Sequence, residues 1–188
     1  MKNKYLVFLF FLLFINREAK SQIVYSTSKG EASFFSKAPI EDIDAHSQQL
    51  SSFINTSNNE IAFVIPIRSF HFQKALMEEH FNEKYIDSNK FPNATYKGKI
   101  NEKIDFTKDG SYSVTATGKF TIHGVEKQRT DSATLVIVAN QFTLIGSFNV
   151  SLKDHNIEIP TLLFRNIAEI IKVNFNAIYS PYQKDEKK

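Results

Sequence analysis

The sequence predicts an all-β protein: an antiparallel barrel of about eight strands, with one short helix between the early strands. Three stretches, at residues 112–123, 142–153 and 171–179, alternate apolar and polar residues with a period of two. Because successive side chains on a strand point to opposite faces, each stretch predicts a long strand with one apolar face. Such strands are typical of antiparallel sheets that curve around an apolar interior, and closure into a barrel removes the exposed edges.

Shorter patterns predict the remaining helical segments, strands and turns of the barrel. Apolar residues at helical spacing predict the helix over 73–86, and it must end before Pro92 because proline disfavours a helical residue before it. One or two helical turns are predicted over 161–169. Further strands are predicted at 31–36, 40–47, 60–72, 94–100 and 131–139. Turn residues separate the strands at 55–59, 108–110, 123–127, 139–141 and 154–156.

The strand predicted from residue 60 is apolar on both faces in its first half. A strand of this kind is expected to be covered on its outer side as well as on its inner side. The helix that follows in the chain is the segment expected to provide the cover.

Residues 1–21 predict a cleavable export signal. Lys2 and Lys4 precede an apolar run over 5–15, and Ala19-Lys20-Ser21 offers small residues for cleavage before Gln22. The run is shorter than the roughly 20 residues that span a bilayer, so an uncleaved anchor is the less favoured alternative. We therefore expect a periplasmic or secreted protein in which residues 22–188 form one barrel domain.

Charge and cysteine content exclude several classes of protein. The net charge of +3 lies entirely within residues 1–21, and the rest of the chain is formally neutral. Nucleic-acid binding needs clustered Lys and Arg on one face, so no nucleic-acid partner is predicted. The chain contains no cysteine, which excludes disulfides, thiolate metal sites, cysteine nucleophiles and a bacterial lipoprotein anchor. Its stability must therefore come from one sizeable core.

No pattern predicts a catalytic residue, a metal site or a cofactor. The five histidines show neither the i, i+4 spacing nor the His-Glu-x-x-His motif of a helical zinc site, and no nucleophile elbow or phosphate loop occurs. The alternative that we keep is an enzyme acting on a lipid through His71, Glu79 or His80, and those groups would have to converge at the mouth of the barrel. The interior of the barrel is the better candidate for function, since an eight-stranded barrel can hold one elongated ligand.

Three glycines, Gly98, Gly118 and Gly146, lie on the apolar parity of their predicted strands. A glycine in a strand marks a bend or a place where another group approaches the backbone closely. Two interpretations stay open from the sequence, namely corners of the barrel and a ligand groove.

Four segments in order resemble the YceI-like proteins: residues 34–41, residues 68–72, the run from Met77 through Phe91-Pro92-Asn93-Ala94-Thr95-Tyr96, and Gly118-Lys119-Phe120-Thr121-Ile122-His123-Gly124-Val125. The resemblance extends over nearly all of residues 22–188. It implies an extended, lipocalin-like barrel of eight strands with a long hydrophobic tunnel, in the periplasm or secreted. Residues 151–156 and 157–170 depart from the family pattern, which affects the ligand's identity more than the fold.

Members of this family bind polyisoprenoids, isoprenoid quinones or fatty-acid derivatives, and some form homodimers. The resemblance thus implies a binding protein for a lipid with a long apolar tail, active in carriage, storage or an envelope stress response. The alternative is a barrel filled by its own side chains that acts through a protein partner or a dimer interface. The residues predicted to line the ligand space are Phe63, Ile65, Phe70, Phe72, Met77, Phe81, Tyr96, Val114, Ala116, Gly118, Phe120, Phe148 and Val150.

Overall fold

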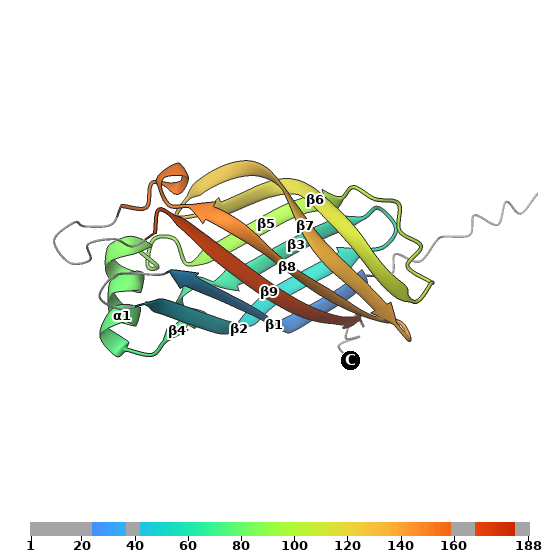
Figure 1. Cartoon of the computed structure of the whole chain (residues 1–188), viewed down its shortest axis with the longest axis horizontal. Coiled ribbons are helices and arrows are strands. Elements are labelled where there is room, and N and C mark those ends of the chain that lie inside the picture. The colour runs from blue at the N-terminus through green and yellow to red at the C-terminus, as the bar shows by residue number, and fades with distance from the viewer. Residues whose placement is uncertain (1–23, 37–41, 159–167, 183–188) are drawn as a thin grey trace, which may run out of the picture.

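The computed structural model describes residues 24–36, 42–158 and 168–182, which form one closed antiparallel β-barrel (Figure 1). The strands follow the order β1-β9-β8-β7-β6-β5-β3-β2, and a further pairing of β1 with β2 closes the ring. The all-β prediction of an eight-stranded barrel is therefore confirmed. The strands of the ring are β1 (Val24–Ser36), β2 (Ile43–Asn55), β3 (Glu60–Pro66), β5 (Asn93–Ile100), β6 (Gly110–Ile122), β7 (Val125–Val138), β8 (Gln141–Ser151) and β9 (Ile170–Pro181).

The alternating stretches became β6, β8 and β9, and their apolar parity faces the interior as predicted. Val114, Leu144 and Tyr179 are buried on these strands. The two apolar residues on the opposite parity, Ile145 and Ile178, are 49% and 52% exposed. The period-two pattern thus decided which face of each strand became the core.

Strands β1 and β2 extend well beyond the predicted ranges of 31–36 and 40–47. In β2 the inward positions include Ser47 and Ser52, both buried, so the apolar alternation is interrupted. Burial of a hydroxyl requires a hydrogen-bond partner. Ser47 Oγ lies 2.6 Å from Ser69 Oγ, and Ser52 Oγ donates to Ala62 O at 2.8 Å. These partners come from other parts of the chain, which the local pattern does not show.

The β1–β2 pairing also changes register midway. Gly30 pairs with Leu50 and Ala32 pairs with Ser47, which places an irregularity between them. A bulge of this kind moves the following residues to the other parity. A strict period of two therefore fails to describe β2 as one strand.

The short helix lies between early strands, as predicted. A 3₁₀ turn (Ile67–Ser69) and the two-residue strand β4 (His71–Phe72) follow β3, and β4 pairs with β2. Helix α1 (Ala75–His80) then continues into a π-helical turn, η2 (Phe81–Tyr85). It lies at one end of the barrel (Figure 1). Among the described helices, none has the length and apolar character needed to cross a membrane.

The helix does not cover the outer side of β3, so that prediction is wrong. Val64, on the outer face of β3, is 39% exposed. Ala62, on the same face, is buried beside its cross-strand neighbour Phe53. Neighbours within the sheet are enough to shield a side chain as small as alanine.

The end of the barrel opposite α1 is filled by aromatic side chains. Tyr25 and Phe142 stack with ring centroids 3.7 Å apart, and Phe106 lies 5.5 Å from Phe142. Tyr179 is fully buried, and its hydroxyl lies 2.7 Å from Ser52 Oγ. These contacts close the barrel at this end.

The hairpin turns fall where they were predicted, and the turn between β7 and β8 suggests a stabilising change. Ala139 and Asn140 connect the strands with φ of 46° and 64°. An L-residue in this left-handed region costs about 1–2 kcal/mol, part of which glycine's greater freedom in the unfolded chain offsets. We predict that Ala139→Gly raises the free energy of unfolding by about 0.5–1 kcal/mol, measured by urea denaturation.

The matched control is Ala94→Gly, because Ala94 is a buried strand residue that does not have a positive φ. There glycine gains no conformational relief and removes a packed methyl group, so stability should fall. Equal losses in both variants would contradict the prediction.

The terminal segments 1–23 and 183–188, the segment 37–41 and the segment 159–167 lie outside the described residues. The expected export signal falls within the first of these, and most of the helical turns expected over 161–169 fall within the last.

Candidate functional site

The barrel encloses an apolar cavity between its filled end and the end that carries α1. Its volume is about 160 Å³, and its lining includes residues from all eight strands of the ring. Ten of the residues predicted to line the ligand space do line it: Phe63, Ile65, Phe70, Phe81, Tyr96, Val114, Ala116, Phe120, Phe148 and Val150. Their contact with a ligand stays a prediction.

A second cavity of about 70 Å³ lies beneath the helical segment. Phe72 and Met77, which were predicted for the same ligand space, line this second cavity and not the first. Met77 comes from α1, so the helix forms part of the wall. The predicted single space is therefore two adjacent spaces.

An aromatic cluster of Phe34, Phe70, Phe72 and Phe81 stands between the two cavities. The ring centroid of Phe34 lies 5.2 Å from that of Phe70, 5.8 Å from that of Phe72 and 5.5 Å from that of Phe81. Tilted and edge-on contacts at these distances are favourable for aromatic rings. The residues that line both cavities are Phe34, Phe81, Ile86, Leu152, Ile157 and Ile171.

Gly118 is the one predicted residue that lines neither described cavity. It pairs directly with Gly98 of β5, and a Cβ atom added to either glycine would overlap the backbone of the opposite strand. The pair thus lets β5 and β6 approach closely. The expectation that Gly118 faces a ligand is corrected, because the neighbouring strand already occupies that space.

We predict that Gly118→Ala lowers the free energy of unfolding by about 1–3 kcal/mol, the usual cost of forcing a methyl group into a packed site. The measurement is urea denaturation of the apo protein. The control is Gly110→Ala on the same strand, where the added Cβ would meet only the Tyr112 ring, at 3.3 Å. A Gly118→Ala variant as stable as the control would contradict the close approach.

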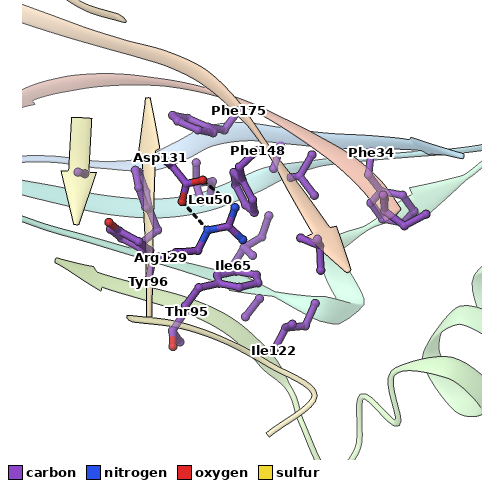
Figure 2. A pocket seen from close by; sticks show the side chains of 18 of the residues that line it. Phe34, Leu50, Ile65, Thr95, Tyr96, Ile122, Arg129, Asp131, Phe148 and Phe175 are labelled. Carbon is purple, nitrogen blue, oxygen red and sulfur yellow. Dashed lines mark hydrogen bonds and ion pairs between the residues drawn. The ribbon is translucent and has the colours of Figure 1, made fainter. Parts of the chain in front are cut away.

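Two charged side chains, Arg129 and Asp131 of β7, lie in the lining of the larger cavity (Figure 2). Arg129 Nε donates to Asp131 Oδ2 at 2.5 Å, and Arg129 Nη2 donates to Asp131 Oδ1 at 2.7 Å. The guanidinium also lies over the Phe148 ring, 4.6 Å from its centroid, and 5.4 Å from that of Phe120. The pair is bidentate and largely sheltered, with side chains 19% and 23% exposed.

The sequence analysis missed this pair, although a signal was present. Arg129 and Asp131 share the parity of Leu135 and Ile137, both of which are buried in the core. The predicted strand began at Asp131 and so excluded Arg129. Charged residues on the inward parity of a barrel strand are the signal that should have identified the pair.

Tyr96 contributes a further polar group to the same cavity. Its hydroxyl is buried and has no hydrogen-bond partner among the described residues. Burial, with a smaller contribution from the Asp131 carboxylate, raises the pKa of Tyr96 to about 12. The hydroxyl therefore keeps its proton at neutral pH and can donate it in a hydrogen bond.

The histidines do not gather into a metal-binding group in the parts of the chain that are described. His71 is exposed, with its Nδ1 atom 3.5 Å from Glu78 Oε2, whereas His80 lines the second cavity and Glu79 is exposed. These three residues thus do not share the lining of either described cavity. Within the described ranges, no cluster of three or more His, Asp or Glu side chains suits a metal ion.

His155 has a structural role. Its Nδ1 atom donates to Val125 O at 3.1 Å, while His123 Nδ1 donates to His155 O at 3.1 Å. Burial lowers the pKa of His155, so the neutral ring is favoured. These bonds tie the 3₁₀ turn η3 (Lys153–His155) to the start of β7.

The model of the YceI-like domain family matches residues 17–179. The chain belongs to the YceI-like family. Family and fold are both of the binding-protein type. A search of curated proteins finds no match.

Solved YceI-like structures share the barrel. A polyisoprenoid-binding domain from Saccharophagus degradans, implicated in plant cell wall breakdown, aligns with a TM-score of 0.73 at 15% identity, covering 86% of this chain and 99% of its own. BcnA of Burkholderia cenocepacia aligns with a TM-score of 0.67 at 17% identity, and the alignment covers 81% of this chain and 96% of BcnA. The YceI protein of Campylobacter jejuni aligns with a TM-score of 0.54 at 17% identity, and the alignment covers 84% of this chain and 86% of the Campylobacter protein. At these identities the likeness shows the fold alone.

Proposed function

We propose that this protein is an exported, non-catalytic binding protein that holds the apolar chain of a lipid inside its barrel. The observation that carries the proposal is the apolar cavity of about 160 Å³ enclosed by the barrel strands. The description of the Saccharophagus degradans domain as polyisoprenoid-binding supports the choice of ligand class. Candidate cargoes are polyisoprenoids, isoprenoid quinones and fatty-acid derivatives.

Burial of a long apolar chain supplies the affinity in this proposal. Each Å² of apolar surface removed from water contributes roughly 25 cal/mol, so a long chain needs few hydrogen bonds to bind. The filled-barrel alternative, in which the protein acts through a partner or a homodimer interface, accounts for the aromatic end of the barrel but leaves the cavity without a role.

The volume sets a condition on how a long chain binds. A cavity of about 150 Å³ lined by Leu, Ile and Phe is known to bind benzene, so about 160 Å³ holds one ring-sized group. A longer lipid needs the second cavity as well. The rings of Phe34 and Phe81 must then turn aside so that the two spaces join.

The export signal over residues 1–21 is the basis for proposing a periplasmic or secreted location. In that location the protein would carry or store a lipid between membranes or take part in an envelope stress response.

Native mass spectrometry of the protein, purified from its own envelope and then incubated with polyisoprenoids and quinones, tests the function directly. We predict a discrete bound lipid that organic extraction releases. Ala116→Trp should abolish this uptake, because Ala116 lines the cavity and a tryptophan there fills it. The matched control is Ser113→Trp on the exposed face of the same strand, which should bind as the wild type does. Equal uptake by both folded variants, or an empty wild-type protein, would refute the proposal.

A chain-length series tests whether the aromatic cluster divides the cavity. We predict that Phe81→Ala raises the affinity for long chains at least tenfold over wild type and changes the affinity for short chains little, since it removes a ring between the cavities. The control is Leu76→Ala in helix α1, which continues directly into the turn that carries Phe81. Leu76 is 61% exposed and lines neither cavity. A length preference unchanged by Phe81→Ala would show that the ring does not restrict the space.

A further inference from the structure

The barrel wall is incompletely paired beside the larger cavity. β7 and β8 pair only from Ala133↔Gly146 to Val138↔Gln141, although β7 begins at Val125 and β8 continues to Ser151. On their other sides, β6 pairs with β7 as far as Val125 and β9 pairs with β8 as far as Ser151. The facing edges of β7 and β8 therefore separate toward the end that carries α1 (Figure 1).

Arg129 is the side chain that crosses this separation. Its Nη2 atom donates to Asn149 O of β8 at 3.0 Å, while Asp131 holds the guanidinium from the β7 side. Beyond Arg129, the separation closes where His155 bonds to Val125 O. Arg129 thus lies both in the lining of the cavity and at a lateral opening of the wall.

The polar groups at this place have hydrogen-bond donors to spare. The bonds of Arg129 to described residues use Nε and Nη2, so Nη1 is left to solvent or to a ligand. The buried hydroxyl of Tyr96 has no partner among the described residues. A buried donor without an acceptor is costly, so the site is suited to a ligand that brings an acceptor atom.

The charge at this place is already balanced. Among the described residues, Arg129 and Asp131 are the only charged ones in the lining of the larger cavity, and they neutralise each other. A carboxylate or phosphate placed against Arg129 would also lie close to the Asp131 carboxylate, and two like charges in a sheltered site repel strongly. A neutral carbonyl oxygen can accept the same hydrogen bonds without this repulsion.

We propose that Arg129, Asp131 and Tyr96 bind the polar end of the lipid at the opening between β7 and β8, and that this end is a neutral carbonyl group. The inference rests on the proposed lipid-binding function and narrows it. Lipids with a quinone ring or an amide fit this chemistry, whereas free fatty acids and prenyl phosphates do not. Arg129 and Tyr96 donate to the carbonyl, and Asp131 sets the selectivity by neutralising Arg129.

The test compares octadecanamide with octadecanoate, which share an 18-carbon chain and differ at the polar end. Dissociation constants are measured by fluorescence displacement at pH 8, where the acid is ionised. The wild type should bind the amide at least tenfold more tightly. Asp131→Asn should reverse the preference toward the carboxylate, because it leaves the charge of Arg129 uncompensated. Asp44→Asn, an exposed change on β2, is the control and should leave the preference unchanged.

Tyr96→Phe provides a second readout that keeps the aromatic ring. It should weaken amide binding about fivefold and leave the binding of octadecane unchanged.

The head-group proposal is overturned if the wild type binds amide and carboxylate equally, or if the folded Asp131→Asn protein keeps the wild-type preference. Failure to bind any of the three ligands would instead overturn the lipid-binding function itself. A parallel comparison of an isoprenoid quinone with a prenyl phosphate repeats the test on isoprenoid chains, where the quinone should bind more tightly.

Discussion

Closure of the sheet is the constraint on which the rest of this structure depends. Strand β1 pairs with both β2 and β9, so each strand of the ring has two neighbours and no strand is the outermost one. Once the ring is closed, every inward side chain must share one limited interior. At one end the aromatic rings of Tyr25, Phe106 and Phe142 fill it. Toward α1 the side chains leave the cavities that we assign to a ligand.

Arg129 and Asp131, the only charged residues in the described lining of the larger cavity, lie where the pairing of β7 with β8 is incomplete. Charged groups in an apolar barrel are costly unless they are paired and hydrogen-bonded. The bidentate contact between Arg129 and Asp131, with the bond to Asn149 O, meets that requirement. Both side chains also lie in the lining of the larger cavity. We propose that one cluster thus has two roles, structural support of the wall and recognition of a polar group.

Most of the fold could be predicted because the alternation of residues is a local signal. Strands β6, β8 and β9, the short helix and the hairpin turns follow from patterns within each segment. β2 was predicted too short because Ser47 and Ser52 interrupt the apolar parity, and their hydrogen-bond partners come from elsewhere in the chain. The irregular register opposite Gly30 is a second reason why β2 was predicted too short. A bulge is defined by two strands together, so the pattern of one strand does not show it.

The sequence by itself determined which side chains face inward, because strand geometry links each residue to one face. Only the tertiary structure decided which of those side chains meet, because contact depends on the register between strands. Gly118 faces Gly98 and not a ligand, since the β5–β6 register places them opposite each other. The same register sets Tyr96 beside Phe120, and the β6–β7 register sets Phe120 beside Lys127, which brings Arg129 to the Phe120 ring. Residues from three strands thus form one polar site that no single segment of the sequence contains.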